Sequence, residues 1–181
     1  MHTDEEDIIK LLRDDHSSEE GFLLLVKKYQ QQLYWSIRRL VHDHDDTEDA
    51  LQNTFIKVWK GIKKFRGDSQ LYTWLYRIAT NEALSLLKRR KRFRTLSFND
   101  ALKEMNVLSN NDPLYDGNAI DNKLQAAIIS LPPKQRIVFN MKYYDDLKYE
   151  QMSEILGTST GALKASYHLA VKKIEKHVLT D

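Results

Sequence analysis

Two groups of side chains in this 181-residue chain could contact nucleic acid, and the first lies near the C-terminus. Apolar residues recur at helical spacing between residues 149 and 178, and Lys164, Ala165, His168 and Lys172 fall on the opposite side of the second expected helix. Lysine can contact a phosphate or the edge of guanine, histidine can do either, and a small apolar group can meet a thymine methyl. This face favours duplex DNA, although a helical hairpin can also serve only for packing.

The second group is a block of interleaved cations and aromatic rings, residues 54–94. It holds 12 Lys and Arg against 2 Asp and Glu, a net charge of +10. Aromatic rings can stack on unpaired bases while cations follow the phosphate backbone, so the block favours single-stranded or melted DNA. Trp74 and Tyr76 point to different faces of one helix and cannot both be buried in the same core. Two plainer interpretations stay open: a solvated basic helix, and Trp74 as an ordinary core residue.

The chain offers little for catalysis or for a metal. It contains no cysteine, which excludes disulfides, thiolate metal sites and a cysteine nucleophile. The run of residues 42–46, HDHDD, could suggest a metal cluster, but alternate residues on a helix diverge, and a solvated turn between helices is favoured. The sequence shows no phosphate-binding glycine loop, serine elbow or zinc-protease helix, and Asp145 and Asp146 fall in an expected turn. We therefore predict neither an enzyme nor a cofactor.

Composition indicates a soluble, mostly helical chain. Apolar residues make up 41% and charged residues 30%, and only 3 prolines and 6 glycines argue for long helices with few breaks. No apolar run is long enough to span a membrane, and the acidic N-terminus is unlike a signal peptide, so we expect a cytoplasmic protein. Net charge is −7 over residues 1–53 and +10 over residues 54–94. This segregation suggests a basic protein surface as the partner of the first segment and phosphate as the partner of the second.

Hydrophobic periodicity predicts an all-α fold of two small domains, residues 1–94 and 119–181. In the first, helices are expected over residues 22–41, from a cap at Asp46 or Thr47 to about residue 62, and over residues 71–90, with a loop at 65–70. The expected buried face of the middle helix comprises Ala50, Leu51, Phe55, Val58, Trp59 and Ile62.

The second domain is predicted to follow a flexible, extended, acidic linker over residues 95–118, where periodicity is lost. Helices are expected over residues 119–130 and 134–144, the latter opened by Pro132 or Pro133. The C-terminal hairpin follows: Gly157 ends its short first helix, and Ser159 caps its longer second one. Such a pair, joined by a turn of three or four residues, can place its second helix in the major groove.

Taken together, these segments resemble the extracytoplasmic-function (ECF) sigma factors, bacterial transcription initiation factors of the sigma-70 family. The resemblance covers nearly the whole chain and rests on three motifs: DTEDALQNTFIKVWK (46–60), FRGDSQLYTWLYRIATNEA (65–83), and SLPPKQRIVFNMKYYDDLKYEQMSEILGTSTGALKASYHLAVKKI (130–174). It implies a factor without activity of its own that lends promoter recognition to core RNA polymerase.

The resemblance also implies roles for particular residues. The helix that begins near residue 46 would dock on the clamp of the polymerase's large catalytic subunit, with polar contacts from Asp46, Glu48, Asp49, Gln52 and Asn53. The loop from Phe65 to Leu71, with Asn81 on the following helix, would hold a base flipped out of the −10 element, and its contacts would offset the cost of unstacking. The full set of −10 residues is Phe65, Arg66, Gly67, Asp68, Ser69, Tyr72, Trp74, Tyr76, Arg77, Asn81, Lys88, Arg89 and Arg90.

The C-terminal hairpin would read the −35 element through Ser159, Thr160, Lys164, Ala165, His168, Leu169 and Lys172. Many relatives carry arginine where Ser166 and Leu169 stand, which implies fewer bidentate guanine contacts here. The linker acids Asp100, Glu104, Asp112 and Asp116 could mimic nucleic-acid charge along the RNA exit path. An anti-sigma protein is a further partner that the resemblance implies.

Two other functions compete with this one. A conventional helix-turn-helix regulator would bind a duplex operator by itself, usually as a dimer, but would have no use for a base-flipping loop. A helical adaptor that binds only protein would leave the +10 block of residues 54–94 unexplained.

Overall fold

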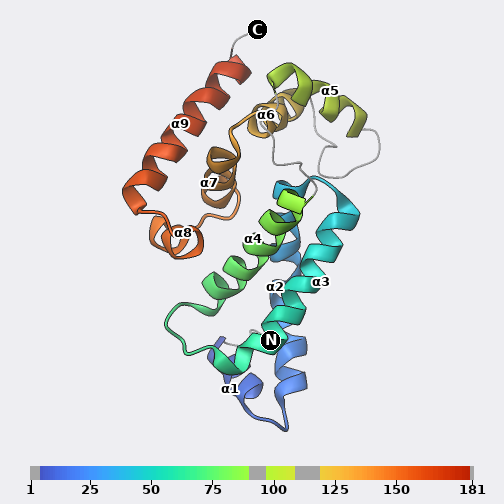
Figure 1. The fold of residues 1–181 in the computed structure, drawn as a ribbon, viewed down its shortest axis with the longest axis vertical. Helices are drawn as coiled ribbons and strands as arrows, with labels where there is room; N and C mark the ends of the chain where they lie inside the picture. Colours follow the sequence, from blue (N-terminus) through green and yellow to red (C-terminus); the bar gives the residue numbers. More distant parts are fainter. Residues whose placement is uncertain (1–4, 90–96, 109–118, 180–181) are drawn as a thin grey trace. The chain divides into compact units, whose positions relative to one another are not determined.

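The computed structural model describes residues 5–89, 97–108 and 119–179, and every regular element in these ranges is a helix, as predicted (Figure 1). Helices α1 to α4 form one compact unit; α5, α6, α7, α9 and most of α8 form another. None of the helices described is both long and apolar enough to cross a membrane. Their bounds are α1 Glu5–Arg13, α2 Ser18–Val41, α3 His44–Gly61, the 3-10 turn η1 Ile62–Lys64, α4 Leu71–Arg89, α5 Phe98–Leu108, α6 Ala119–Ile129, α7 Pro133–Tyr143, α8 Tyr149–Leu156 and α9 Thr160–Leu179.

The core of the first unit lies where α2, α3 and α4 pack on one another. Each of these helices packs against the other two, and the side chains between them include Leu25, Leu33, Ile37, Val58, Leu75, Ala79 and Ala83, all at most 1% exposed. Gly61 allows the end of α3 to approach α4 closely, because a Cβ there would stand 3.3 Å from the Trp74 ring. This packing fixes the two ends of the 65–70 loop.

Helix α1 is an element that the periodicity above does not predict. It buries Ile8 and Leu12, at 0% and 1% exposure, against α2. A Cβ on Gly21 would stand 2.8 Å from the Leu11 side chain and the Leu12 backbone, so glycine permits the close approach of the two helices. Three acids in the first turn and Arg13 in the last match the helix dipole. The signal was present in the sequence, but it extends over only nine residues.

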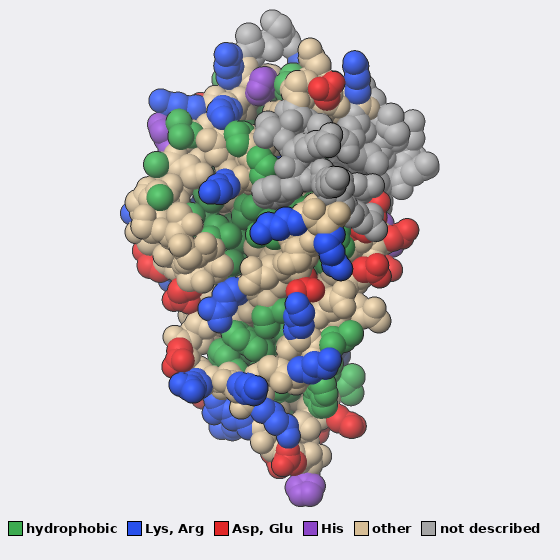
Figure 2. Space-filling view, viewed as in Figure 1, with side chains coloured by type: hydrophobic (Ala, Val, Ile, Leu, Met, Phe, Trp, Pro, Cys, Tyr) green, Lys and Arg blue, Asp and Glu red, His purple; other side chains and the backbone are tan. Residues whose placement is uncertain are grey.

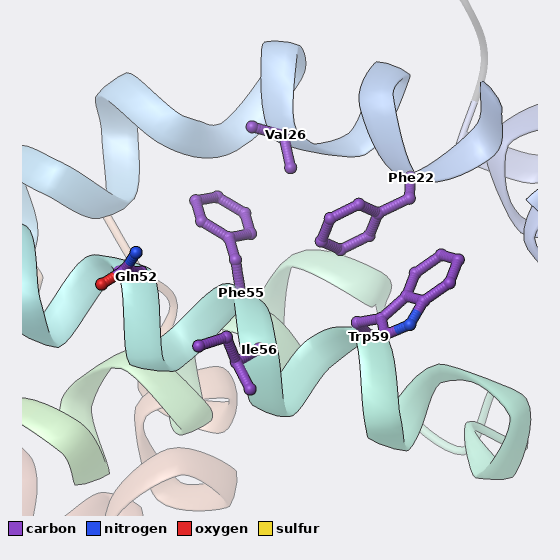
Figure 3. A pocket seen from close by; sticks show the side chains of 6 residues that line it. All are labelled: Phe22, Val26, Gln52, Phe55, Ile56 and Trp59. Atoms are coloured by element: carbon purple, nitrogen blue, oxygen red, sulfur yellow. The ribbon is translucent and has the colours of Figure 1, made fainter. Parts of the chain in front are cut away.

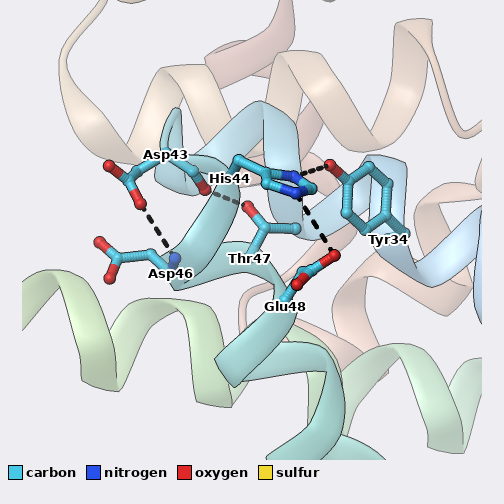
Figure 4. Close-up of polar contacts among 6 residues, drawn as sticks. All are labelled: Tyr34, Asp43, His44, Asp46, Thr47 and Glu48. Carbon is cyan, nitrogen blue, oxygen red and sulfur yellow. Dashed lines mark hydrogen bonds and ion pairs between the residues drawn. The ribbon is translucent and has the colours of Figure 1, made fainter.

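Helix α3 begins earlier than predicted (Figure 4). Asp43 is its N-cap: one carboxylate oxygen accepts the Asp46 backbone N–H at 2.9 Å, and the Thr47 hydroxyl donates to the Asp43 carbonyl at 2.6 Å. The prediction that Asp46 or Thr47 caps this helix is therefore wrong. Residues 44–46, expected in a solvated turn, form its first turn instead.

The second unit has its core between α6, α7 and α9. Ala127, Ile128, Leu131, Phe139, Ala170 and Ile174 form one buried cluster. Pro133 is the first residue of α7 and Pro132 its N-cap, which confirms that one of these prolines opens the helix. Arg136, 4% exposed, donates from Nη1 to the Ile129 carbonyl at 2.8 Å and so joins α7 to the end of α6.

The prediction of an extended linker over residues 95–118 is wrong for residues 98–108, which form α5. Ser97 caps α5: its hydroxyl accepts the Asp100 N–H at 3.1 Å and donates to the Asp100 carboxylate at 2.6 Å. Phe98, Ala101 and Leu102 pack on Ala126 and Ile129 of α6. Residues 109–118, with Asp112 and Asp116, and the Glu104 side chain lie outside the described structure.

Candidate nucleic-acid interface

The 65–70 loop is anchored at its first residue and open beyond it. Phe65 is 7% exposed, and its ring lies 5.2 Å from the Trp74 ring of α4. Arg66, Gly67 and Asp68 are exposed and Ser69 is half-buried. Gly67 has φ +86°, a backbone conformation that favours glycine, so the chain can turn sharply there. The buried ring of Phe65 makes it an anchor of the loop and not a surface for DNA.

Helix α4 carries its candidate residues on two different faces. Arg77, Asn81, Ser85 and Lys88 are exposed at spacings of four, four and three, which places them along one side of the helix. We call this stripe the outer face of α4. Arg89 is exposed next to it, and the half-buried Trp74 lies one turn before it. Asn81 therefore lies about 10 Å along the axis from Trp74.

The other face of α4 corrects one predicted contact. Tyr76 is 0% exposed, so its side chain is inaccessible to DNA. It belongs to the row formed by Tyr72, Leu75, Tyr76 and Ala79, which packs toward α2 and α3; the Tyr72 and Tyr76 rings lie 5.2 Å apart, and Tyr72 lies 6.0 Å from Tyr29 of α2. The half-buried Tyr72 is thus also part of the packing between helices. As expected, Trp74 and Tyr76 are not buried together.

Residues 54–94 contain two acidic side chains, Asp68 and Glu82, and one of them is paired with a lysine. Glu82 lies largely buried on α4, and its carboxylate accepts a hydrogen bond from the Lys57 ammonium of α3. Figure 2 shows Lys and Arg side chains gathered where η1 and the start of α4 lie. The exposed cations there include Lys60, Lys63, Lys64 and Arg66. Such a surface attracts phosphate and loses affinity as salt rises.

The predicted docking helix is α3, and four of its five predicted contacts are exposed. Glu48, Asp49, Gln52 and Asn53 lie on the solvent side, and we call them the docking face. Asp46 is 0% exposed, which corrects its assignment as a contact: it lies on the stripe Asp46, Ala50, Thr54 and Val58, whose spacing of four turns it inward. At the start of the helix His44 bonds to the Tyr34 hydroxyl at 2.8 Å and approaches Glu48 at 3.4 Å (Figure 4).

An apolar groove of about 410 Å³ lies between α2 and α3 (Figure 3). Its lining is Phe22, Val26, Gln52, Phe55, Ile56 and Trp59. Trp59 is 42% exposed, so its predicted place in the core is wrong, and Phe55 and Leu51 are only half-buried. The Phe22 ring contacts Trp59 edge-on at 4.9 Å between centroids. Ala50, Val58 and Ile62 are buried as predicted.

The α8–α9 hairpin follows the predicted pattern. Gly157, at φ +62°, ends α8, and the Ser159 hydroxyl accepts the Ala162 N–H at 3.4 Å at the start of α9. Leu163, Ala170 and Ile174 are buried. The predicted base-facing residues lie on the opposite side: Ser159, Lys164, Ala165, His168, Leu169 and Lys172 are exposed, and Thr160 is half-buried. Lys164 Nζ lies 5.6 Å from the centroid of the Tyr149 ring, a cation–π contact that orients the lysine.

Arg90 lies outside the described residues, so the structure does not place it. Within the ranges described, no group of three or more His, Asp or Glu side chains could hold a metal ion. The residues of the 42–46 run serve as cap, first turn and buried stripe of α3.

Comparison with known proteins decides the family. Residues 25–93 match the family Sigma-70 region 2, and residues 121–174 match Sigma-70, region 4. The RNA polymerase sigma-H factor of Pseudomonas aeruginosa is 30% identical over 187 residues, which cover 97% of this chain and 95% of the relative. The chain belongs to the ECF sigma factors of the sigma-70 family. The ECF RNA polymerase sigma-E factors of Salmonella typhimurium and Escherichia coli are likewise 30% identical, over 95% of this sigma factor and 94% of each relative.

Solved structures share the fold of this sigma factor. The sigma factor RpoE, solved in complex with the anti-sigma factor NepR from Bartonella quintana, superposes with a TM-score of 0.69 at 22% identity, covering 90% of this chain and 99% of that one. CnrH, solved with the cytosolic domain of CnrY, gives 0.68 at 20% identity, covering 94% and 95%. The two family matches and the relatives that are 30% identical, rather than these structures, show that it is a transcription initiation factor that directs RNA polymerase to promoters. A stand-alone operator-binding regulator is not favoured.

Proposed function

We propose that this sigma factor reads two promoter elements in two different states, the −10 element melted and the −35 element as duplex. The observation that carries the first half is the outer face of α4, where Arg77, Asn81 and Lys88 form one exposed stripe that begins next to the anchored 65–70 loop. A strand that leaves the loop can follow this stripe without crossing an acidic side chain, because Glu82 is largely buried and paired with Lys57.

The chemistry of the −10 residues fits an unpaired strand. The polar side chains of residues 66–70, exposed except for the half-buried Ser69, can surround a flipped base. The Asn81 amide offers both donors and an acceptor to a base edge. Arg77, Lys88 and Arg89 are exposed cations that can neutralise phosphates. Tyr76 is excluded from this set because it is buried, and Phe65 and Tyr72 support the others from below.

For the −35 element we propose that α9 enters the major groove with Lys164, Ala165 and His168 toward base edges. Ser159, Thr160 and Lys172 would contact the backbone at the borders of this face, and Leu169, 49% exposed, offers apolar contact to a thymine methyl. Since lysine is the only long cation among the base-facing residues, few bidentate guanine contacts are available. Affinity would therefore rest on core polymerase more than on the −35 sequence.

Polymerase docking is proposed for the docking face of α3 together with the apolar groove. Gln52 belongs to both: it is one of the four exposed docking residues and also lines the groove. The two surfaces are therefore continuous, with Ile56 and Trp59, 45% and 42% exposed, on the apolar side. An interface with a polar part and an apolar centre is the usual anatomy of a specific protein contact.

We further infer that the sigma factor has no enzymatic activity of its own and works in the cytoplasm, where polymerase and DNA are. An anti-sigma protein is a proposed additional partner, supported by the complex of its structural relative RpoE with NepR. The acidic residues of 95–118 remain proposed as a nucleic-acid mimic, of which Asp100 is occupied in the cap of α5.

Run-off transcription with purified chain, bacterial core polymerase and a library of genomic promoter fragments tests the proposal. Transcripts whose templates share −35 and −10 sequences are expected, and their alignment gives the consensus. If the chain bound duplex DNA without polymerase and gave no transcripts, the proposal would be contradicted and an operator-binding regulator would be favoured.

A further inference from the structure

Helix α1 makes a direct contact with the start of the 65–70 loop, across 52 residues of sequence. Arg13, the last residue of α1, donates from Nη2 to the Phe65 backbone carbonyl at 3.1 Å. The Phe65 backbone N–H donates to the Ile62 carbonyl at 3.0 Å, and the Phe65 ring is buried beside Trp74. Both backbone groups and the side chain of Phe65 are therefore held, and the loop leaves from a fixed point.

A second contact joins the same two segments. Lys63 of η1 donates to the Asp15 carboxylate, just beyond α1, and the hydrogen bond from Lys63 holds the Asp15 pKa below its usual value. Exposed ion pairs of this kind contribute little on their own. Here the pair adds a second attachment between η1 and the end of α1, two elements that already contact each other.

Helix α1 is itself held rigidly, so Arg13 acts from a fixed base. Ile8 and Leu12 are buried against α2, and Gly21 allows the close approach of the two helices. At the other end of α1, Glu5 accepts the hydrogen bond of the Tyr29 hydroxyl, and the Tyr29 ring lies 6.0 Å from Tyr72 of α4. Motion of α1 is thus restricted from both ends.

We infer that Arg13 is a positioning residue for −10 recognition: by holding the Phe65 carbonyl it sets the direction in which the 65–70 loop leaves the core, before DNA binds. This inference rests on the proposed role of the loop in holding a flipped base. A loop that already has its bound conformation loses less conformational entropy on binding. The hydrogen bond from Arg13 should therefore increase the affinity of the loop for the flipped base. Arg13 touches neither DNA nor polymerase in this assignment.

The test compares Arg13→Ala and Arg13→Lys with wild type and with Lys10→Ala, an exposed cation on the same helix. Open-complex formation is measured on a promoter recovered by run-off transcription, and on versions with an abasic site at each −10 position in turn. Core-polymerase affinity and thermal unfolding are measured for each variant. Arg13→Ala is expected to lower open-complex formation about three- to tenfold on the intact promoter. On the promoter that lacks the captured base, Arg13→Ala and wild type should form open complexes equally well.

Arg13→Lys keeps a cationic donor and should recover part of the loss, while Lys10→Ala should behave as wild type. An equal loss on intact and abasic promoters, a matching loss of polymerase affinity, or no loss at all would each overturn the role of Arg13. If wild type itself shows no sensitivity to any abasic site, the loop captures no base and the proposed function of the loop fails with the inference. Sensitivity of wild type without an effect of Arg13→Ala removes the inference alone.

Discussion

The Tyr29 hydroxyl of α2 donates a hydrogen bond to the Glu5 carboxylate at the first turn of α1. The tyrosine is 4% exposed, and its burial, followed by the bond to Glu5 and the charge of Glu5, raises the pKa of Tyr29 above its ordinary value of 10. The contact holds the beginning of α1, as Arg13 holds its end.

Tyr29→Phe should lower the free energy of unfolding of the first unit at pH 7 by about 1.5–3 kcal/mol, the usual loss for a hydrogen bond to a charged group. The pKa of Tyr29 is higher in the folded than in the unfolded protein, so above pH 10 the unfolded state loses its tyrosine proton first. The stabilisation by this hydrogen bond is therefore complete below pH 10 and is lost as the pH rises above 10. The stability gap between wild type and variant should therefore narrow above pH 10. Urea unfolding followed by tryptophan fluorescence measures it, since Trp35, Trp59 and Trp74 all lie in the first unit. A gap that stays constant from pH 8 to 11 would contradict the account.

Asn81→Ala should lower open-complex formation more than polymerase binding. Asn81 is exposed on the outer face of α4, whereas the docking face belongs to α3. Loss of one or two hydrogen bonds to a base should cost about 1–2 kcal/mol, or roughly five- to thirtyfold. Ser85→Ala, one turn further along the same face, is the matched control and should have a small effect. Equal losses in the two assays would remove Asn81 from the base-reading residues.

Most helices are predictable from sequence because their apolar stripes and end signals agree. The α8–α9 hairpin shows this well, with Gly157 and Ser159 at its turn and Leu163, Ala170 and Ile174 inside. Helices α1 and α5 are short, and their signals are local: acids in the first turn of α1, and the cap that Ser97 makes for α5. Both helices are stabilised by packing on a neighbour, which periodicity within one segment does not show.

The face that a helix buries is less predictable than the helix itself. On α3, Asp46 and Thr54 lie inside and Trp59 and Ile56 outside, the reverse of what their polarity suggests. The reason is that α3 packs against α2 and α4, and the positions of these two helices determine which side of α3 is buried. Tyr76 on α4 is a different case: its place among the cations predicts DNA contact, yet its ring packs in the core. The exposure of Ile56 and Trp59 on α3 leaves an apolar groove that the sequence analysis does not predict, although it names Trp59.

Lys164→Ala should weaken transcription from promoters that depend on their −35 element, by about fivefold, or roughly 1 kcal/mol. If Lys164 contacts a phosphate, the slope of log binding constant against log salt concentration should become less steep by about 1. If it contacts a base, the sequence preference at one position of the −35 element should weaken. Lys173→Ala is the matched control on α9, since Lys173 instead bonds to Gln135 of α7 at 3.0 Å. Unchanged activity across −35-dependent promoters would show that this face of α9 does not read DNA.

Ile56→Asp should lower the affinity for core polymerase about tenfold or more, because a charge placed in an apolar contact must be desolvated without a partner. The fold should be kept, since Ile56 is 45% exposed. Leu23→Asp makes the same change at a more exposed apolar residue, 68%, which does not line the groove. Binding to core polymerase by fluorescence anisotropy, with thermal unfolding alongside, compares the two. Equal losses from both variants would indicate a general effect of surface charge, and an unchanged affinity for Ile56→Asp would place polymerase docking away from the groove.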